Sequence, residues 1–590
     1  MNLTKYFERL NPPQKIAVSH YGTPLLIIAG PGTGKTLTLT CRIAYLIENC
    51  GISPENILAL TFTHRAACEM EERLKNILND NISSCGMFIG TFHAFGWGIQ
   101  KIEYSIKNMN MFSLYTENDS LFLLKDITKT KKINVFDLRK KISLFKNKHN
   151  FLQDFDKDNF KELYDCYQNR LKEANALDMD DLVIESINLL EKDACLKKQL
   201  KEKYSHILID EYQDINQAQY ELIKILSGER NNLTVIGDPD QAIYAFRGAD
   251  INNFVQFKKD YPEHTEISLC SNYRSCGAIL QASQEVIGKN RHNLRKFLRS
   301  ELNKGVNIEI MNFLNEKQEA EIVAKRIEQM IGGTSFFAHD SRWAESDKSE
   351  NRSFSDFAIL YRLQVQGNIF EEVLSKHGIP YQRVVPKNEK TDLAEFFYRY
   401  IENPKDWVAE TYIKQSRVLI PEMGNISNIK KMLEEKNKKE LLKIINKEEI
   451  VDALLSFQEE RYNKIHDIKE DTYESKAEKV TLMTLHGAKG LEFPVVFITG
   501  CEENLIPYLK DNYEGKIEEE RRLFYVGMTR AKERLILTMS LSRFIFGKKL
   551  EGDISPFIKD ISEELKKIYE EEKKPKKIKS PEENNQMSLF

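Results

Sequence analysis

Eight residues, AGPGTGKT at positions 29–36, constrain the fold of this chain more than any other stretch. They follow an apolar run, LLIIA, and precede LTLTCRIAYLI, which is compatible with a helix; a phosphate-binding loop requires this strand–loop–helix order. Glycines let backbone N–H groups turn toward phosphate oxygens. The pattern therefore predicts an α/β core with a nucleotide site, and a glycine-rich turn without a ligand is the alternative.

Individual residues of this loop have different expected roles. Lys35 supplies a positive charge at the β- and γ-phosphate oxygens, and the hydroxyl of Thr36 can bind Mg²⁺. Ala29 departs from the consensus, which has a glycine there. The expected nucleotide-binding residues of the loop are Ala29, Gly30, Pro31, Gly32, Thr33, Gly34, Lys35 and Thr36.

A second polar motif, DEYQD at 210–214, also follows an apolar run. Asp210 could hold Mg²⁺, and Glu211 could orient and deprotonate the water that attacks the γ-phosphate. An isolated acidic pair is more often a solvated turn. In a chain that also carries a phosphate-binding loop, nucleotide hydrolysis is the better interpretation.

Short apolar runs recur along the chain in two groups, before and after about residue 268. Helix-like segments follow several of them, which is typical of parallel α/β sheets. Charged stretches with helical periodicity lie between the runs. The runs are at 25–29, 57–62, 207–209, 233–236, 357–361 and 495–499.

We therefore predict an α/β protein with two parallel-sheet cores, each carrying a mainly helical insert. The predicted ranges are 1–96 and 201–267 for the first core, 97–200 for its insert, 268–384 and 479–556 for the second core, and 385–478 for its insert. Residues 557–590 are rich in lysine and glutamate. They are expected to form a flexible tail, because they cannot bury enough apolar surface to fold alone.

Composition excludes several classes of protein. Of the 590 residues 41% are hydrophobic, which rules out global disorder. The formal net charge is −3, so any contact with nucleic acid must be local. Nine cysteines without a C-x-x-C pair argue against a disulfide framework or a zinc site. No apolar run is long enough for a membrane span or a leader peptide, so we expect a cytoplasmic protein.

Further motifs follow in a fixed order from Gln14 to Arg534 and cover nearly the whole chain. The ordered motifs are NPPQ (11–14), AGPGTGKT, TFTHRAACEM (61–70), GTFHAF (90–95), DMDDL (178–182), DEYQD, IGDPDQAIYAFRGA (236–249), NYRS (272–275), AILYR (358–362), TLHGAKGLEF (484–493) and EERRLFYVGMTRAKERL (519–535). With them the chain resembles the UvrD/Rep/PcrA family of superfamily 1 DNA helicases. The resemblance implies two RecA-like cores, with ATP and Mg²⁺ as ligands and DNA as the track.

The resemblance also assigns residues around the base and ribose of ATP. Gln14 would read the adenine edge, and Tyr273 and Arg42 would sandwich its ring. Glu492 would contact the ribose. These four residues complete the expected nucleotide site.

Three further residues are implied at the γ-phosphate. Gln241 would sense it, and Arg274 and Arg530 would act as arginine fingers from the second core, each typically worth on the order of 10³–10⁵ in rate. Outside this family, either arginine would more often be a surface or ion-pair residue. The expected catalytic residues are Lys35, Glu211, Gln241, Arg274 and Arg530.

DNA contacts follow from the same resemblance. The implied residues are Phe62, Thr91, His93, Tyr244, Phe246, Arg247, His486 and Lys489. Aromatic faces stack on bases with about 1–3 kcal/mol per base, and polar donors bind the phosphates. Phe246 stands where many relatives carry tryptophan. Taken singly, the phenylalanines would more often be core residues.

The first insert concentrates positive charge at residues 125–148, where only Asp126 and Asp137 are acidic. The basic residues are Lys125, Lys129, Lys131, Lys132, Arg139, Lys140, Lys141, Lys146 and Lys148. In the family this insert lies beside the nucleic acid. We therefore expect a surface that contacts phosphates and weakens with salt, and a solvated helical face is the alternative.

The second insert departs from the family. It is shorter than usual, and RVVPKNEKTDLAEFF replaces the glycine-rich pattern expected after Pro380 and Tyr381. A Gly-Ile-Gly signature for duplex contact is missing, and LIPEMGNIS retains only Gly424. The grip on duplex DNA is therefore left open.

The last five residues, QMSLF, resemble the peptide by which bacterial proteins bind the DNA polymerase sliding clamp. Leu589 and Phe590 would fill an apolar pocket, and Gln586 would hydrogen-bond at its rim. Met587 and Ser588 lie between them. An ordinary chain end is the alternative.

Together these features predict an ATP-dependent helicase that moves on single-stranded DNA, by resemblance 3′ to 5′, in repair or replication restart. It would act on single strands and on junctions with duplex, as a monomer or weak dimer. One alternative is a translocase that displaces proteins with little unwinding. Another is a clamp-tethered DNA-binding scaffold with a vestigial ATPase.

Overall fold

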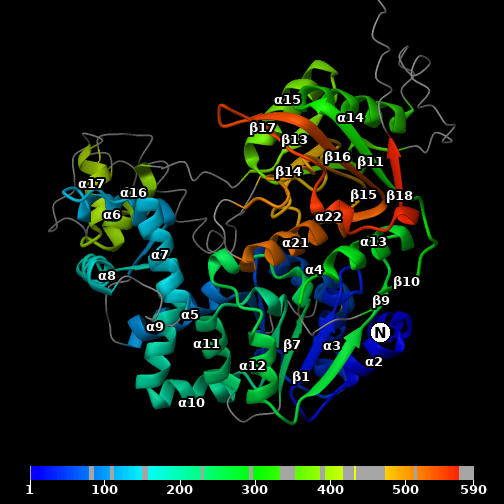
Figure 1. The fold of residues 1–590 in the computed structure, drawn as a ribbon. Helices are drawn as coiled ribbons and strands as arrows, with labels where there is room; N and C mark the ends of the chain where they lie inside the picture. Colours follow the sequence, from blue (N-terminus) through cyan, green and yellow to red (C-terminus); the bar gives the residue numbers. More distant parts are fainter. Residues whose placement is uncertain are drawn as a thin grey trace, which may run out of the picture.

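The fold was analysed in a computed structural model. It describes residues 2–78, 86–106, 112–148, 157–227, 232–291, 297–332, 352–385, 393–415, 429, 431–433, 441, 445, 472–509 and 514–569. These residues form two sheet-centred cores and a helical arm that projects from the first core (Figure 1).

The first core is a six-stranded sheet with the order β3–β2–β6–β7–β1–β8. Every pairing in it is parallel. Its strands are β1 (Leu25–Ala29), β2 (Ile57–Thr61), β3 (Phe88–Thr91), β6 (His206–Ile209), β7 (Leu233–Gly237) and β8 (Thr265–Leu269). Because the strands are parallel, their carboxyl ends share one edge, which carries both AGPGTGKT and DEYQD.

Helices cover both faces of this sheet, so its inner strands are buried at every position. Along β1, Leu25 and Ile27 belong to one hydrophobic cluster, and Leu26 and Ile28 belong to the cluster on the opposite face. The helices of the core are α1 (Asn2–Arg9), α2 (Pro12–Ser19), α3 (Lys35–Glu48), α4 (His64–Leu78), α11 (Gln217–Ser227) and α12 (Asn253–Asp260).

The second core is an eight-stranded sheet with the order β13–β14–β12–β15–β16–β11–β18, and β17 pairs with β16 in the only antiparallel pairing of its described strands. Its strands are β11 (Ile308–Asn315), β12 (Phe357–Tyr361), β13 (Tyr381–Arg383), β14 (Val480–Thr484), β15 (Phe493–Ile498), β16 (Ala531–Ile545), β17 (Lys548–Glu551) and β18 (Lys566–Tyr569). The helices are α13 (Gly277–Ile287), α14 (Glu316–Ile331), α15 (Gly367–Lys376), α21 (Glu514–Met528) and α22 (Pro556–Lys559). A short pair, β9 (Ser271–Asn272) with β10 (Arg299–Ser300), lies beside it.

All six apolar runs of the sequence form strands, and the α/β class with two parallel-sheet cores is confirmed. One expected boundary cuts an element, because β8 continues to Leu269, two residues past the predicted end of the first core. The strands that sequence reasoning missed include β3, β8, β11 and β18. Several of them have alternating or partly exposed patterns, which give no continuous apolar run.

The predicted tail begins too early at residue 557. The segment through Tyr569 belongs to the second core, because β18 pairs in parallel with β11 at the sheet edge. Phe557, Ile558, Ile561 and Leu565 are buried in the main cluster of that core. These four apolar side chains lie within nine residues and hold the segment on the second core, although its charged composition suggested a tail.

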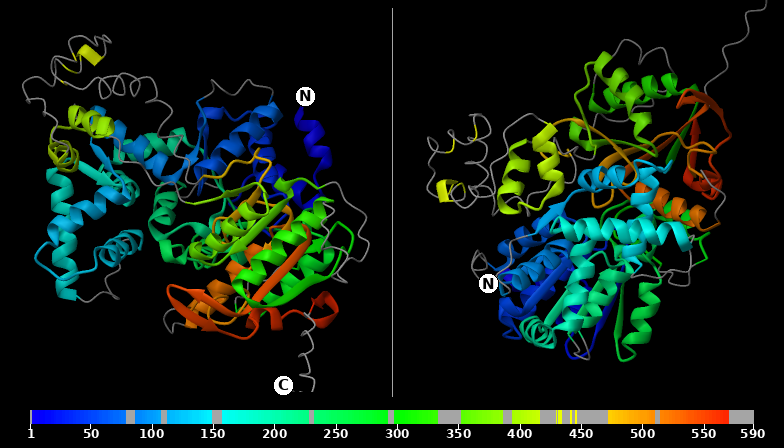
Figure 2. Two further views of the ribbon diagram at one scale, coloured as in Figure 1. Left: turned by 90° about the horizontal axis from the view of Figure 1, so that it is seen from above. Right: turned by 90° about the vertical axis from the view of Figure 1, so that its left-hand side faces the viewer.

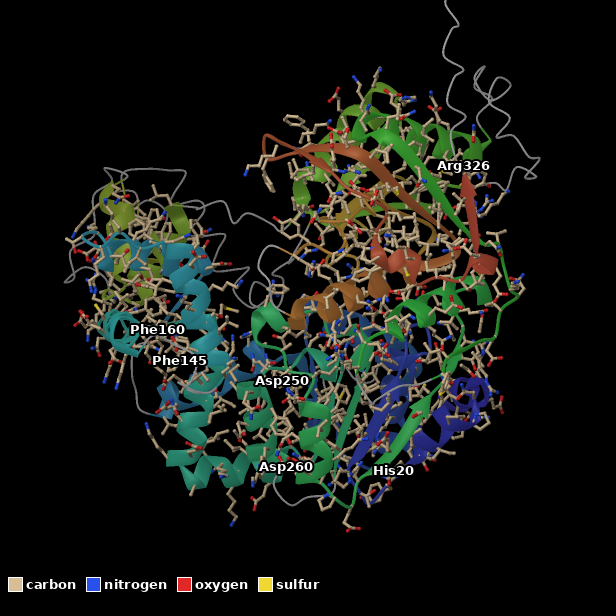
Figure 3. All side chains as sticks on the ribbon, in the orientation of Figure 1. His20, Phe145, Phe160, Asp250, Asp260 and Arg326 are labelled. Carbon is tan, nitrogen blue, oxygen red and sulfur yellow. The ribbon has the colours of Figure 1, made fainter. Side chains whose placement is uncertain are left out.

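The arm is formed by both inserts. The first insert contributes β4 (Ser113–Tyr115), α6 (Glu117–Ile127), α7 (Val135–Asn147), α8 (Lys157–Glu173) and β5 (Ala176–Asp178), and the second contributes α16 (Leu393–Glu402) and α17 (Trp407–Gln415). Three further helices, α5 (Phe92–Ile106), α9 (Met179–Lys192) and α10 (Ala194–Lys203), connect the arm to the first core and pack in the hydrophobic cluster of its sheet. Seen from above, the arm lies to one side of the two sheets (Figure 2). Within it, Phe145 and Phe160 pack edge to face at 5.6 Å (Figure 3).

The two inserts share a single hydrophobic core. Phe397 and Ile401 of α16 belong to the same buried cluster as Tyr115 and Leu124 of the first insert. Buried polar contacts cross the boundary too, since the Tyr115 hydroxyl donates to Asp406 Oδ1 at 2.9 Å. Part of the second insert is thus packed as a component of the first. Gly424 lies outside the described residues.

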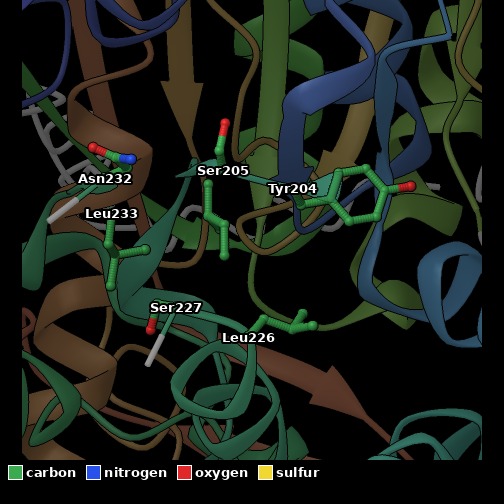
Figure 4. A pocket seen from close by; sticks show the side chains of 7 residues that line it. Tyr204, Ser205, Leu226, Ser227, Asn232 and Leu233 are labelled. Carbon is green, nitrogen blue, oxygen red and sulfur yellow. The ribbon is translucent and has the colours of Figure 1, made fainter. Parts of the chain in front are cut away.

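None of the described helices is long and apolar enough to cross a membrane. A small cavity of about 10 Å³ lies near the amino ends of β6 and β7, lined by Tyr204, Ser205, Leu226 and Ser227 among others (Figure 4). It has room for about one water molecule. It also lies at the end of the sheet opposite to AGPGTGKT, so it is not the candidate site.

Candidate nucleotide site and nucleic-acid interface

The AGPGTGKT loop links β1 to α3 and has the backbone shape of a phosphate cradle. Gly32 and Gly34 have φ values of +66° and +78°, in the left-handed region that favours glycine. A Cβ at Gly32 would lie 2.6 Å from Cβ of Arg274, and one at Gly34 would lie 2.8 Å from Nε2 of Gln14. Both positions therefore require glycine for conformation, and Gly32 requires it for space as well.

Lys35 and Thr36 begin α3, whose amino end favours negative charge. The Lys35 ammonium lies 3.4 Å from the carbonyl oxygen of Ala29 at the start of the loop. The Thr36 side chain is half-buried at the same helix end. This set of backbone amides, ammonium and hydroxyl fits a nucleoside triphosphate with Mg²⁺.

The loop is held from two sides. Gln14 forms a capping box with Asn11 at the start of α2, and its Nε2 donates to the carbonyl oxygen of Thr33 at 2.9 Å. From the second core, Asn272 Nδ2 donates to the Pro31 carbonyl at 2.7 Å, and the backbone N–H of Tyr273 donates to the Gly32 carbonyl at 2.9 Å. The structure thus brings Gln14 and Tyr273, both expected at the adenine ring, to the phosphate loop.

Asp210 and Glu211 stand at the carboxyl end of β6, beside the loop. Burial raises the pKa of Asp210 to about 7, and the adjacent Glu211 carboxylate adds to the rise. Burial also acts to raise the pKa of Glu211, but Lys35 and Lys489 outweigh it and lower that pKa. Glu211 itself has φ +49°, a backbone conformation that costs on the order of 1–3 kcal/mol outside glycine and is concentrated at functional sites.

Gln241 reaches the same edge from the loop after β7. Its Nε2 donates to Oδ2 of Asp238 at 2.7 Å, and the backbone N–H of Asp238 donates to Oε1 of Gln213 at 2.8 Å. Gln213 in turn donates to the Glu211 carboxylate. A chain of hydrogen bonds therefore joins Gln241, the expected γ-phosphate sensor, to Glu211, the expected general base.

Arg274 and Arg530 approach from the second core. The Nε of Arg274 donates to Oε2 of Glu492 at 2.6 Å, and Lys532 pairs with the other carboxylate oxygen at 2.7 Å. Burial acts to raise the pKa of Glu492, but Arg274 and Lys532 lower it to about 2. With both oxygens in ion pairs, the ribose contact of Glu492 stays a prediction.

Arg530 is 2% exposed and is fixed by its own core. Its Nε donates to the Val526 carbonyl at 2.9 Å and its guanidinium to the Leu491 carbonyl at 3.1 Å. Burial lowers its pKa to about 9, and the nearby Arg274 adds to the shift, while Glu211 of the first core opposes it. The structure thus brings both arginines to the first core, Arg274 against the phosphate loop and Arg530 within reach of the Glu211 charge.

The expectation for Arg42 is wrong. Its guanidinium is buried and donates to the carbonyl oxygens of Ala17, Val18 and His20 at 2.7–3.2 Å, and to the hydroxyl of Thr234 at 2.9 Å. These bonds fasten α3 to the end of α2 and to β7. The residue has no free face for a base, because packing within the first core takes its side chain.

Four rings form a continuous row across both cores, which we call the aromatic row: Phe62, Tyr244, Phe246 and His486. Phe62 stacks on Tyr244 at 4.9 Å, Tyr244 meets Phe246 edge to face at 5.9 Å, and Phe246 meets His486 at 5.6 Å. Phe246 is 43% exposed. Aromatic faces of this kind can stack on bases of any sequence, and the contact of this row with DNA stays a prediction.

Charged and polar residues flank the aromatic row. The Arg247 guanidinium lies 5.6 Å from the Tyr244 ring and 5.8 Å from the Phe246 ring, and it is exposed. His93 and Thr91 lie where β3 passes into α5. Burial lowers the pKa of His93, and it lowers that of His486 to about 3, so both imidazoles are neutral at pH 7.

Lys489 lies beside the aromatic row, with its ammonium 5.0 Å from the centre of the Tyr244 ring, and its contact with DNA stays a prediction. Its ammonium is buried, pairs with Asp214 of DEYQD, and donates to the Gln241 carbonyl at 2.9 Å. Lys489 therefore joins the second core to the first, directly beside Glu211. A single lysine in a family motif gave no sign of this role, since its partner Asp214 lies 275 residues away.

Two residues of the expected basic surface are also buried. Lys146 is 1% exposed and pairs with Asp178 at 2.8 Å and Asp181 at 2.6 Å, and Arg139 pairs with Asp180 at 3.2 Å. The DMDDL motif therefore neutralises part of the positive charge of α7. Lysines that remain exposed on the insert include Lys125, Lys132, Lys140 and Lys141.

Sequence reasoning missed Asn272 and Asp214, which hold the two cores together at the nucleotide edge. Both lie inside motifs that were recognised, NYRS and DEYQD, but neither residue type announces a structural role. Asn11 was missed as well; its Nδ2 donates to the Tyr273 hydroxyl at 3.0 Å. The Asn-x-x-Gln spacing of a capping box was the available signal.

Two parallel-sheet cores, one with a phosphate loop and an acidic pair and the other with arginines facing them, define a two-core P-loop nucleotide hydrolase. The N-terminal domain model of the UvrD/REP helicases matches residues 10–262, and the UvrD-like helicase C-terminal domain model matches 267–413 and 387–542. The chain belongs to the UvrD/Rep helicase family.

Curated relatives agree with this assignment. The chain is 32% identical to the ATP-dependent DNA helicase PcrA of Staphylococcus aureus (strain NCTC 8325 / PS 47), over 94% of this chain and 86% of the relative. It is 34% identical to the ATP-dependent DNA helicase Rep of Buchnera aphidicola subsp. Acyrthosiphon pisum, over 94% of this chain and 98% of the relative.

Proposed function

We propose that this chain is an ATP-dependent DNA helicase that moves on single-stranded DNA, in the 3′ to 5′ direction, in repair or replication restart. The observation that supports it best is the aromatic row. It crosses from the first core to the second beside the acidic pair, so closing the cleft on ATP would change the grip on stacked bases. The direction and the cellular process rest on resemblance to PcrA and Rep.

In the proposed reaction, Lys35 and the loop amides bind the phosphates, and Glu211 accepts a proton from the attacking water. Thr36 and Asp210 would hold Mg²⁺, which when bound neutralises charge on the phosphate oxygens. Gln241 relays the state of the γ-phosphate to Glu211 through Asp238 and Gln213. Glu211 is a carboxylate at pH 7, which is the form that can accept this proton, and Lys35 and Lys489 lower its pKa further.

Arg274 and Arg530 would stabilise the negative charge of the transition state from the second core. Arg274 forms an ion pair with Glu492 at 2.6 Å. To reach the γ-phosphate, it must either break this ion pair or move together with Glu492. Closure of the cleft therefore becomes a condition for fast hydrolysis. This links the chemical step to the movement of one core against the other.

A translocase that displaces proteins with little unwinding remains the second candidate. The packing of α16 and α17 into the first insert favours it, since this part of the second insert is occupied by contacts within the arm. Residues 586–590 lie outside the described residues. Their proposed binding to a sliding clamp rests on the sequence QMSLF alone. The proposed cytoplasmic location and the proposed monomer or weak dimer rest on composition and on the family.

The decisive experiment measures steady-state ATP hydrolysis with and without single-stranded DNA, for the wild type and Glu211→Gln. Strong stimulation by DNA that is lost in the variant supports a DNA motor. Hydrolysis that DNA does not stimulate, in folded protein that binds ATP, would favour the scaffold alternative. A strand-displacement assay with 3′- and 5′-tailed duplexes then separates the helicase from the protein-displacing translocase and tests the direction.

A further inference from the structure

The loop that carries Phe246 and Arg247 rests on the helical arm. Gly248 ends this loop with φ +89°, and a Cβ there would lie 3.0 Å from Cβ of Asn147. Asn147 is the last residue of α7 and is almost fully buried. The backbone of the aromatic row therefore lies directly against one side chain of the arm.

Asn147 uses both ends of its amide in buried hydrogen bonds. Its Nδ2 donates to Oδ1 of Asp180 at 3.1 Å and to the Ser143 hydroxyl at 3.2 Å. Its Oδ1 accepts from Nδ2 of Asn216 at 2.8 Å. One side chain thus joins α7, the first turn of α9 and the segment that follows DEYQD.

Asp180 extends this set toward the DNA-contact candidates. Its Oδ2 accepts from Arg139 at 3.2 Å, and its charge acts on the His93 imidazole. Arg247 acts on the same imidazole. Asp180 therefore faces the polar flank of the aromatic row as well as Asn147.

Asn216 extends the set toward the nucleotide site. It lies two residues after Asp214, caps α11 by accepting from the Gln219 backbone N–H at 2.9 Å, and pairs through its backbone with Ala249. Next to it, the backbone N–H of Asp250 (labelled in Figure 3) donates to the Ile215 carbonyl at 3.2 Å. The segment after DEYQD and the end of the Phe246–Arg247 loop are thus fixed to each other and to Asn147.

We propose that Asn147 is a positioning residue that holds the Phe246–Arg247 loop in the arrangement that binds single-stranded DNA and passes DNA occupancy to the ATP site through Asn216. This inference rests on the proposed DNA motor function. The side-chain hydrogen bonds of Asn147 go to Ser143, Asp180 and Asn216, none of which is assigned to the nucleotide or to the γ-phosphate. It acts on DNA through the loop backbone and on ATP hydrolysis through the segment that begins with Asp210.

The test compares wild type, Asn147→Ala and a control, Asn188→Ala, which removes a local hydrogen bond to Glu185 elsewhere on α9. ATP hydrolysis is measured against the concentration of single-stranded DNA. Asn147→Ala is expected to raise the DNA concentration for half-maximal stimulation roughly tenfold, as expected when buried hydrogen bonds lose their partner. Its rate without DNA and its KM for ATP should stay within about twofold of wild type, and the control should match wild type.

A pair of further variants separates positioning from general destabilisation. Asn147→Asp brings a second carboxylate against Asp180 and should weaken DNA stimulation at least as much as Asn147→Ala. Adding Asp180→Asn restores a donor for the introduced carboxylate and keeps an oxygen for Arg139. The double variant should therefore return the half-maximal DNA concentration to within about twofold of wild type.

Three results overturn the proposal. They are an unchanged DNA response in Asn147→Ala, an equal loss of the DNA-free rate, and a double variant no better than Asn147→Asp. Wild-type hydrolysis without any DNA response would overturn the proposed function and this inference together. A stimulated wild type with an unaffected Asn147→Ala would overturn this inference alone.

Discussion

The two cores use the same architecture to supply opposite charges. Each is a parallel sheet covered by helices, and each presents polar residues where strands end. The first core supplies the carboxylates of Asp210 and Glu211 beside the loop lysine, and the second supplies Arg274 and Arg530. Neither core alone holds a complete set for hydrolysis, so activity depends on how the two meet.

They differ also in which contacts hold these residues. The phosphate loop depends on glycines with positive φ and is contacted by Asn272 and Tyr273 of the other core. Arg530, in contrast, is fixed by carbonyl oxygens of its own core. The phosphate loop is thus held by contacts from both cores and Arg530 by contacts within one, and the predictions below test the two cores in turn.

The largest effect is expected at Arg274. Arg274→Ala removes the proposed arginine finger of the second core, so DNA-stimulated kcat should fall by about 10³–10⁵. Binding of ATP should change little, because the loop belongs to the first core. Arg326→Ala is the control, since Arg326 (labelled in Figure 3) pairs with Glu309 within the second core. A fall of less than tenfold would show that the second core does not act through this residue.

A variant of Arg42 tests the stability of the first core, not its part in catalysis. Arg42→Ala leaves three backbone carbonyls and a hydroxyl without their charged donor and should lower the free energy of unfolding by about 3 kcal/mol. At low temperature the Kd for ATP should be unchanged. Denaturant unfolding and nucleotide binding measure the two effects, with the exposed Arg73→Ala as control. Weakened ATP binding with unchanged stability would restore the stacking role that the sequence suggested.

Phe246 tests the surface that spans both cores. Phe246→Ala removes an exposed ring and should weaken binding of single-stranded DNA by about 1–3 kcal/mol, whereas Phe246→Trp should bind at least as tightly as wild type. Val255→Ala, another exposed apolar side chain of the first core, serves as control. Equal DNA affinity in Phe246→Ala and wild type would remove the aromatic row from the DNA path.

The sequence predicted those parts of the molecule that local patterns determine. Continuous apolar runs identified the central strands, and the spacing of AGPGTGKT identified the glycines whose φ is positive. Arg42 was misassigned and the ion pair of Lys489 was missed, because the partners come from residues far away in the chain: Thr234 for the former and Asp214 for the latter. Burial of Lys146 by Asp178 and Asp181 had the same origin. Pairings between distant segments depend on packing that no local pattern encodes.

The smallest effects concern pH, and here the cores should respond in opposite directions. Burial lowers the pKa of His206 in the first core to about 4, below its ordinary value of 6.5. The folded state therefore binds fewer protons than the unfolded state. Its stabilising contribution is present above pH 6.5 and is lost as the pH falls toward 4, by about 2 kcal/mol at pH 5.

In the second core, His377 lies between Glu321 at 2.9 Å and Glu328 at 3.1 Å, and its hydrogen bond to Glu321 leads the rise in its pKa. Its contribution is present below pH 6.5 and is lost as the pH rises through the raised pKa. Unfolding of His206→Asn and His377→Gln, measured from pH 5 to 8, should therefore differ from wild type with opposite slopes. Slopes equal to that of wild type in both variants would show that neither histidine contributes to the pH dependence of stability in this way.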